Sequence, residues 1–384
     1  MVLGTYYDGV EIHRKEKILY ARFLVPHRVI STCGAAGGVR DDLAYVYNHQ
    51  SSEPSGHDHP DHIIAVSDPV AYMALVCGRH GLPENRCAGL GTAANMRCAV
   101  IKEERFRDLV VLAACTGGVE GNAGRAGDPA TVYEHDGIYE QVSAEGPVLD
   151  GTINTILLVN RELTPGAMVC AVMTATEAKA AVMQELAINS RYSNGLATGT
   201  GTDQIAVAAR LHTGAPLSGA GKHTVLGELI GKTVHDAIKG TLSVQDVLSP
   251  EKQRSVVRHL ERFGASRKSL MRAVAARLPG EKGRLFEKNF VVLESDPLTV
   301  AAVAALVHVR DKVEWGVLAR DCTPELWATY GAQVAAAVSG NYAMLPGYRE
   351  VLAGAYRGNG DGDFLNLVEH AVAMGFIDKW PEDK

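Results

Sequence analysis

Hydroxyl, amide and charged side chains gather in three short segments between residues 151 and 203. The segments read GTINT (151–155), TATEAK (174–179) and ATGTGTD (197–203). Glycine and alanine between the polar residues let the backbone approach a ligand closely, whereas a buried hydroxyl needs a partner and adds little to a core. Each segment alone is typical of turns and helix caps. Three of them within so short a stretch favour a ligand-binding site.

Glu177 is a candidate catalytic carboxylate. It lies on a helix predicted from Thr164-Pro165 to Leu186, which is apolar nearly all round and is therefore expected to lie between two layers. A carboxylate on such a helix needs a cation or several donors, or its pKa rises. Thr174 shares a face with Glu177, and Lys179 does not. A structural ion pair is the alternative interpretation.

The glycine-rich segment 117–129, GGVEGNAGRAGDP, follows a predicted strand. Its backbone N–H groups could converge into an anion-binding nest beside Arg125, with Asn122 as an amide donor for a carbonyl oxygen or a phosphate. The segment has neither the Gly-Lys-Ser/Thr end of a Walker loop nor GxGxxG spacing, so a nucleotide site is not indicated. A flexible connection is the alternative.

The run HDHPDH (57–62) resembles a metal site by composition alone. Zinc ligands usually come from separated, rigidly held positions, and this run follows the turn-rich segment SSEPSG, so we expect an exposed polar loop. Metal binding is the alternative. No Gly-x-Ser-x-Gly elbow is present to support Ser-His-Asp catalysis.

Composition indicates an ordinary globular protein of 384 residues with 21% charged residues, long enough for two domains. The net charge of −6 and the absence of basic clusters interleaved with aromatics argue against nucleic-acid binding. Seven scattered cysteines without a CxxC pair are typical of reduced thiols. The first residues lack signal-peptide features, and the longest apolar stretch is too short to span a bilayer. We expect a cytoplasmic location.

The pattern of elements predicts an α+β fold. Strands are expected at 18–25, 28–32, 62–67, 98–102, 109–114, 153–160 and 203–211, and helices at 69–80, 164–186 and 223–242. After residue 248 the pattern becomes almost purely helical, with helices expected at 250–264, 267–278, 297–316, 324–339, 347–357 and 364–378. We therefore predict a first domain at 1–248 and an all-α bundle at 249–384, to which no chemistry can be attached.

Four of these segments together resemble the adenosylcobinamide amidohydrolase family. They are GTINTILLVNRELTPGAMVCAVMTATEAKAA (151–181), ATGTGTDQIAVA (197–208), NAGRAGDP (122–129) and YNHQ (47–50), and the likeness covers about residues 25–245. The resemblance implies hydrolysis of the amide joining aminopropanol to a corrin side chain, which releases adenosylcobyric acid for cobamide salvage. The corrinoid is then a substrate, and no dedicated cofactor site is recognised.

A fainter likeness concerns the nucleophile. The order Gly-Thr-Ile, strand, Leu-Thr-Pro, helix, Thr-Gly-Thr-Asp is similar to aminopeptidases and acyltransferases of the ornithine-acetyltransferase type, which are layered αββα sandwiches that cleave their own chain before a Ser or Thr nucleophile. This resemblance implies Thr152 as nucleophile, with Thr202 and Asp203 nearby. The base is then the amine freed by cleavage at Gly151–Thr152 or, in an intact chain, Glu177 or Asp203. The amides of Gly117 and Gly118 with Asn122 are expected to hold the oxyanion.

Taken together, these interpretations define the predicted site. The candidate catalytic residues are Thr152, Glu177, Asp203 and Asn122; the candidate substrate-binding residues are Asn48, Thr92, Gly117, Gly118, Arg125, Asp128, Asn154, Lys179, Thr198, Thr200 and Thr202; no metal ligand is proposed. The alternatives are a corrinoid-binding or transport-accessory protein without catalysis and a peptidase-like amidase with another substrate. The alanine-rich C-terminal helices are a possible homo-oligomer contact.

Overall fold

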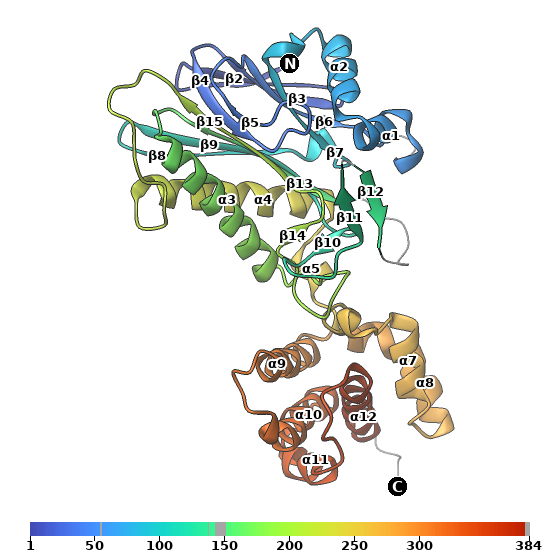
Figure 1. Cartoon of the computed structure of the whole chain (residues 1–384). Helices are drawn as coiled ribbons and strands as arrows, with labels where there is room; N and C mark the ends of the chain where they lie inside the picture. Colours follow the sequence, from blue (N-terminus) through green and yellow to red (C-terminus); the bar gives the residue numbers. More distant parts are fainter. Residues whose placement is uncertain (54–55, 137, 143–150, 381–384) are drawn as a thin grey trace. The chain divides into compact units, whose positions relative to one another are not determined.

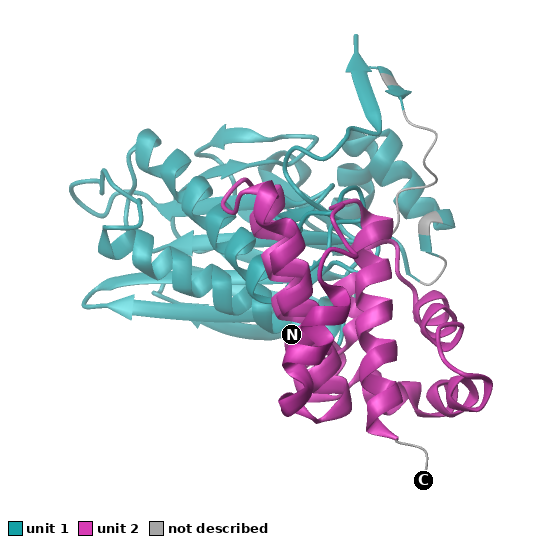
Figure 2. Cartoon of the chain, turned by 90° about the horizontal axis from the view of Figure 1, so that it is seen from below, with its two compact units in different colours: residues 1–248 teal, residues 249–384 magenta. Residues whose placement is uncertain are grey.

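The computed structural model describes residues 1–53, 56–136, 138–142 and 151–380. The chain forms two compact units, Met1–Leu248 and Ser249–Lys384, which Figure 2 colours separately. All the candidate site residues belong to the first unit.

The first unit is built in four layers, helices outside and two sheets inside (Figure 1). The five-stranded sheet has the order β1 (Val2–Tyr6), β2 (Val10–Lys15), β3 (Ile18–Phe23), β6 (Tyr45–Gln50) and β7 (Cys87–Thr92). The six-stranded sheet has the order β5 (Gly38–Arg40), β4 (His27–Ser31), β15 (Gln204–Arg210), β13 (Thr152–Val159), β9 (Leu109–Gly118) and β8 (Val100–Phe106). Helices α1 (Pro60–Ser67) and α2 (Pro69–His80) accompany the first sheet, and α3 (Pro165–Glu185) and α4 (Val225–Gln245) cover the second. The predicted α+β, αββα-type sandwich is confirmed.

Strand β13 is central because it is covered on both faces. All eight of its residues are buried, as its apolar sequence TINTILLV requires. Ile153 and Leu157 pack in the core shared with α3 and α4, whereas Ile156 packs in the core between the sheets. Because side chains alternate along a strand, Thr152 and Asn154 face the space between the two sheets. The candidate nucleophile therefore stands at the rim of that space.

Helix α3 crosses from β13 to the parallel strand β15, which places its buried side on the six-stranded sheet. The Thr164 side chain caps it by accepting from the N–H of Ala167, with proline at the first turn, as predicted. The expectation that α3 lies between two layers is wrong, because Val169 and Met173 are more than half exposed on its outer side.

Among the described helices, α3 alone is long and apolar enough to cross a membrane, judged by length and composition only. The helices 280–294 and 297–314, which are bent against each other, meet the same length and composition criterion when they are taken as one span. Core helices of soluble proteins pass this test as well, and Met168 and Val182 of α3 lie in the core on the sheet.

The segment after residue 58 differs from the sequence-based prediction. Residues 62–67, expected as a strand, belong to helix α1, which starts at Pro60 with the His59 side chain accepting from the N–H of Asp61. Proline at the first helical position overrides the β-branched composition that follows it. Asp61 is buried and forms an ion pair with Arg79 of α2, so this segment is fixed to the next helix.

The second unit is an all-α bundle, as predicted. Its helices are α5 (Pro250–Gln253), α6 (Val256–Leu260), α7 (Arg267–Ala275), α8 (Gly280–Glu294), α9 (Pro297–Glu314), α10 (Thr323–Ser339), α11 (Leu345–Leu352) and α12 (Asp361–Lys379). Phe286, Phe364 and Trp327 fill its core. A buried ion pair joins Arg262 to Asp311 at 2.6 Å, with side chains only 3% and 10% exposed. Removing one partner of such a pair costs about 3–5 kcal/mol, because the other charge is left buried and unpaired.

Candidate functional site

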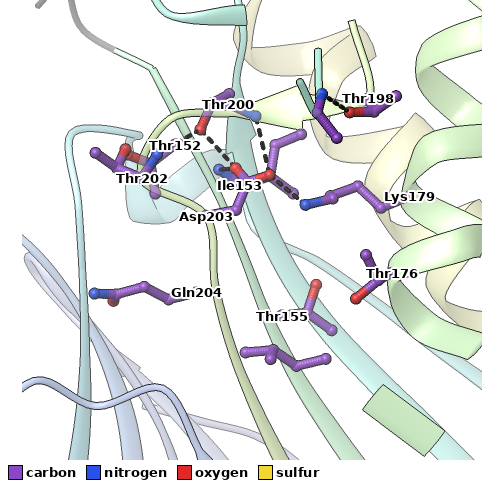
Figure 3. A network of polar contacts seen from close by, with 12 residues as sticks. Thr152, Ile153, Thr155, Thr176, Lys179, Thr198, Thr200, Thr202, Asp203 and Gln204 are labelled. Atoms are coloured by element: carbon purple, nitrogen blue, oxygen red, sulfur yellow. Dashed lines mark hydrogen bonds and ion pairs between the residues drawn. The ribbon is translucent and has the colours of Figure 1, made fainter. Parts of the chain in front are cut away.

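The Asp203 carboxylate is the most heavily bonded side chain of the site (Figure 3). It accepts hydrogen bonds from the N–H of Ile153 at 2.8 Å, the N–H of Thr200 at 2.9 Å and the hydroxyl of Thr200 at 2.6 Å. Lys179 of α3 forms an ion pair with it, and both side chains are mostly buried. The carboxylate thereby ties the start of β13, the turn before β15 and helix α3 together.

Thr152 and Thr202 place their hydroxyls side by side at the start of β13. Their Oγ1 atoms are 2.6 Å apart, and Thr202 Oγ1 donates to the carbonyl oxygen of Gly151 at 3.0 Å. A hydroxyl has one hydrogen to donate, so Thr202 accepts the hydrogen of Thr152. The nucleophile candidate is thus held by a neighbouring hydroxyl.

The Gly151 carbonyl has a second donor. Asn122 Nδ2 donates to the Gly151 oxygen at 3.1 Å, and the Tyr192 hydroxyl fixes the amide by donating to Asn122 Oδ1 at 2.6 Å. Asn122 is almost fully buried. A backbone amide carbonyl therefore sits between two fixed donors, next to a threonine hydroxyl.

A pocket of about 750 Å³ opens beside this cluster. It lies between α3, the short ladder of β10 (Ala123–Gly124) with β14 (Gly199–Thr200), and the segment leading into β11 (Val132–His135). Nine predicted site residues line it: Asn122, Arg125, Asp128, Glu177, Lys179, Thr198, Thr200, Thr202 and Asp203. Thr152 does not line it; its hydroxyl lies behind that of Thr202 and the residue is 7% exposed.

Gly117 and Gly118 do not form the expected anion-binding nest. They are the last residues of β9 and pair with Ile153 and Thr152 in the antiparallel ladder. Extended strand geometry cannot converge successive N–H groups on one anion as a nest does. The donors that do converge on a carbonyl oxygen are the Asn122 amide and the Thr202 hydroxyl.

Asn48 and Asn154 lie between the sheets and not in the pocket. Asn154 Nδ2 donates to Asn48 Oδ1 at 2.9 Å and to the carbonyl of Gly91 at 2.8 Å, and Asn48 Nδ2 donates to Thr116 Oγ1 at 2.7 Å. Both asparagines are buried, so this network joins the two sheets just behind Thr152. It satisfies buried polar groups that would otherwise be costly.

Thr92 is likewise buried outside the pocket, where its hydroxyl accepts from the N–H of Ala94 at 3.0 Å. Its place at the end of β7 makes it part of a turn. The structure therefore separates the predicted binding residues into a pocket group and a group between the sheets.

Glu177 is not the buried carboxylate that the sequence predicted. It pairs with Lys222, and the two side chains are 50% and 67% exposed. It stands at the pocket wall on the solvent side of α3, because that face of the helix has no layer above it. Surface ion pairs of this kind contribute little to stability. Because its side chain is half exposed, the Glu177 carboxylate is accessible to solvent.

Asp128 and Arg125 organise the pocket's second wall. Asp128 accepts from the N–H of Arg125 at 2.7 Å and from the Ser190 hydroxyl at 2.5 Å. Burial opposes ionisation of Asp128, but these bonds, with the Ser193 hydroxyl, hold the pKa of Asp128 below its usual value. Arg125 Nη1 donates to the carbonyl of Leu196 at 3.0 Å, so the glycine-rich segment is fixed to the segment before β14.

Tyr192 is a site residue that the sequence-based prediction missed. It lines the pocket and orients Asn122. The signal was an aromatic residue inside the turn-rich segment NSRYSNG (189–195), where a large side chain needs a packing or bonding reason.

Among the residues that the structure describes, no group of three or more histidine, cysteine, aspartate or glutamate side chains is arranged to hold a metal ion. His59 and Asp61, from the histidine-rich run, take part in the helix cap and the ion pair described above. Beside the pocket, the Thr202 hydroxyl and the Asn122 amide donate to the Gly151 carbonyl oxygen, and the Lys179–Asp203 ion pair lies next to them. Such groups suit acyl-group chemistry.

Comparison with known proteins agrees with this chemistry. The sequence model of the adenosylcobinamide amidohydrolase family matches residues 3–250, beginning earlier than the motifs alone indicated. An uncharacterized protein of Methanocaldococcus jannaschii is 33% identical over 238 residues, which cover 60% of this chain and 87% of that protein. The family match takes in the whole pocket and nearly the whole first unit. The chain therefore belongs to the adenosylcobinamide amidohydrolase family.

Proposed function

We propose that this protein hydrolyses the amide that joins aminopropanol to a corrin side chain of adenosylcobinamide, releasing adenosylcobyric acid for cobamide salvage. The observation that carries the proposal is the Gly151 carbonyl, held by Asn122 and Thr202 beside the Thr152 hydroxyl. Amide hydrolysis needs a nucleophile next to a carbonyl whose oxygen meets fixed donors. Membership of the family supports a corrinoid as the bearer of the amide.

In the intact chain, the donors are occupied by the chain's own carbonyl. A substrate carbonyl needs the same two donors, which the Gly151 carbonyl occupies. Cleavage of the Gly151–Thr152 peptide would vacate the donors and give Thr152 a free α-amine. We therefore include this self-cleavage in the proposal.

The self-cleavage consumes one water molecule. Thr152 Oγ1 attacks the Gly151 carbonyl carbon, the peptide C–N bond breaks, and the hydroxyl proton passes to the departing nitrogen. Water then hydrolyses the resulting ester, which leaves a carboxylate on Gly151 and restores the Thr152 hydroxyl. Asn122 Nδ2 and Thr202 Oγ1 hold the oxyanion in both steps.

Turnover repeats the same chemistry on the substrate. The α-amine of Thr152, with a pKa of about 8, takes the hydroxyl proton as Oγ1 attacks the substrate amide. The amine then passes that proton to the leaving nitrogen of aminopropanol. Water hydrolyses the corrinoid ester and releases adenosylcobyric acid.

Asp203 and Lys179 act as positioning residues in this scheme. The oxygens of Asp203 already accept from three donors besides Lys179, and one of these donors is the N–H of Ile153, next to the nucleophile. The pair therefore fixes the backbone next to Thr152. Glu177, exposed at the pocket wall, is the base in the alternative route, in which an activated water attacks and Thr152 only orients it.

The activity itself is tested by incubating the purified full chain with adenosylcobinamide and measuring released aminopropanol and adenosylcobyric acid by mass spectrometry. We expect both products in equal amounts. Simple amino-acid amides serve as the specificity control and should be poor substrates. Tight corrinoid binding without aminopropanol release would instead make the protein a corrinoid carrier, and cleavage of amino amides but not of the corrinoid would make it a different amidase.

Replacing the nucleophile should abolish turnover. Thr152→Ala is expected to lower kcat by about 10³-fold or more, because it removes both the attacking oxygen and the chain cleavage that vacates the donors. Thr152→Ser keeps a hydroxyl and should retain measurable turnover. Denaturing mass spectrometry should show fragments 1–151 and 152–384 for the wild type and an uncut chain for Thr152→Ala. Near-normal turnover by Thr152→Ala would remove Thr152 as nucleophile and favour the Glu177 route.

Gly199 tests whether the ion pair positions the site. A Cβ atom on Gly199 would lie 2.2 Å from Asp203 Oδ2 and 2.7 Å from Lys179 Nζ, so Gly199→Ala must displace both groups. Displacements of about 1 Å at a catalytic site can cost about 10²-fold in rate, and we expect a loss of that order with circular dichroism unchanged. Gly166→Ala on α3 is the matched control, because its added Cβ would have no atom within 4 Å apart from its chain neighbours and the backbone of its own helix. Full activity of Gly199→Ala would mean that the pair has no positioning role.

A further inference from the structure

We propose that the hairpin of β11 and β12 (Ile138–Gln141) is the outer wall of the corrinoid site and covers the part of the macrocycle that the pocket cannot enclose. The inference rests on the proposed function and extends it to the residues that recognise the corrin ring.

The first observation is the size of the pocket. Pockets of about 300–1,000 Å³ enclose most of a drug-sized ligand, and this pocket has about 750 Å³. A corrin macrocycle with its peripheral amides and its adenosyl group is larger than that class of ligand. The pocket therefore receives the scissile side chain and an edge of the ring, and the remaining ring surface must lie against whatever continues the pocket wall.

The second observation is the continuity of that wall. Asp128, Pro129, Ala130, Thr131 and Val132 line the pocket one after another, and Val132 is also the first residue of β11. The hairpin thus begins inside the pocket lining. It stands clear of the body of the unit (Figure 2).

The third observation is the exposure of strand β11. All four of its residues are exposed, although side chains alternate between its two faces. An isolated two-stranded hairpin is marginally stable in water. A ligand that packs against one face would supply the missing burial, and the face that continues the pocket is the one that carries Val132.

Strand alternation and register identify that face. Glu134 shares the face of Val132, and Gln141 pairs with Val132 across the hairpin. Val132 is 52% exposed and offers apolar surface to the ring edge. The Glu134 carboxylate is an acceptor for the N–H groups of the corrin's peripheral amides. The opposite face carries Tyr133 and, through the pairing of His135 with Ile138, the Ile138 side chain.

The test is equilibrium dialysis of adenosylcobinamide against the full chain, read from the visible absorbance of the corrin. The wild-type hairpin and its variants are all compared in chains that carry Thr152→Ala, so that the bound substrate is not hydrolysed. One variant replaces residues 133–140 by two glycines, which removes the hairpin beyond the pocket lining. A double variant, Val132→Ser/Glu134→Ser, alters the pocket-side face. Its matched control, Tyr133→Ser/Ile138→Ser, alters the same number of exposed side chains on the opposite face. Circular dichroism confirms that each variant is folded.

We expect the shortened hairpin and the pocket-side variant to weaken corrinoid binding by at least about tenfold, because truncating anchoring contacts typically costs that much. The opposite-face control should bind within about twofold of the wild type. Wild-type affinity in the shortened variant would overturn the inference while leaving the proposed function intact. Weakening by the control but not by the pocket-side variant would overturn the choice of face. A wild-type chain that binds no adenosylcobinamide would overturn the proposed function, and this inference with it.

Discussion

The Asp203 carboxylate connects the parts of the chain on which the candidate site depends. It accepts hydrogen bonds from the N–H of Ile153 in the central strand and from the N–H and hydroxyl of Thr200 in the turn before β15. It also forms an ion pair with Lys179 of α3. A largely buried carboxylate is costly unless cations and donors surround it, so the arrangement is tightly specified. Gly199 is required there because any side chain would occupy the position of the carboxylate.

The layers of the sandwich determine where this carboxylate can work. Strand β13 is buried on both faces. Because side chains alternate along a strand, Ile153 faces the helices and Thr152 faces the space between the sheets. Asn154 donates a hydrogen bond to Asn48 of the other sheet, so the two sheets are joined next to Thr152. The donors to the Gly151 carbonyl come from two further segments, around residues 122 and 202. The segments around residues 122 and 202 thus meet the start of β13 at one peptide bond, whose carbonyl oxygen faces two fixed donors as in an oxyanion site.

Much of this was predictable from local sequence. The run of β-branched and leucine residues after Thr152, and Thr164-Pro165 before an alanine-rich stretch, predicted β13 and α3 with nearly correct bounds. The second and third hydroxyl-rich segments line the pocket, and the first is joined to the third by the bonds of Thr152 to Thr202 and of Ile153 to Asp203. They lie together because β13, α3 and the turn before β15 form one parallel crossover.

Other features could not be predicted, or were predictable from signals that were not used. Strands β6 and β7 pair across the intervening helices α1 and α2, and β1 and β7 carry glycines that obscure their period. Strand β2 pairs with its sequence neighbours β1 and β3, and its alternating start Val-Glu-Ile is a signal that was not used. Helix α8 was missed although Phe286, Phe290 and Leu293 show helical spacing, because charged residues surround them. Asn154 was assigned to substrate binding, yet it shares the strand face of Ile156, a buried position, and strand alternation alone would have placed it in the interior.

The central claim is that the Thr152 hydroxyl attacks the corrinoid amide, and a covalent intermediate tests it most directly. The full chain is mixed with excess adenosylcobinamide, quenched in acid during turnover, digested, and its peptides are separated with detection of corrin absorbance and mass. The account predicts a corrinoid ester on the peptide that contains Thr152, absent from Thr152→Ala. Steady turnover with no corrinoid bound to that peptide at any quench time, or an ester on another residue, would contradict it.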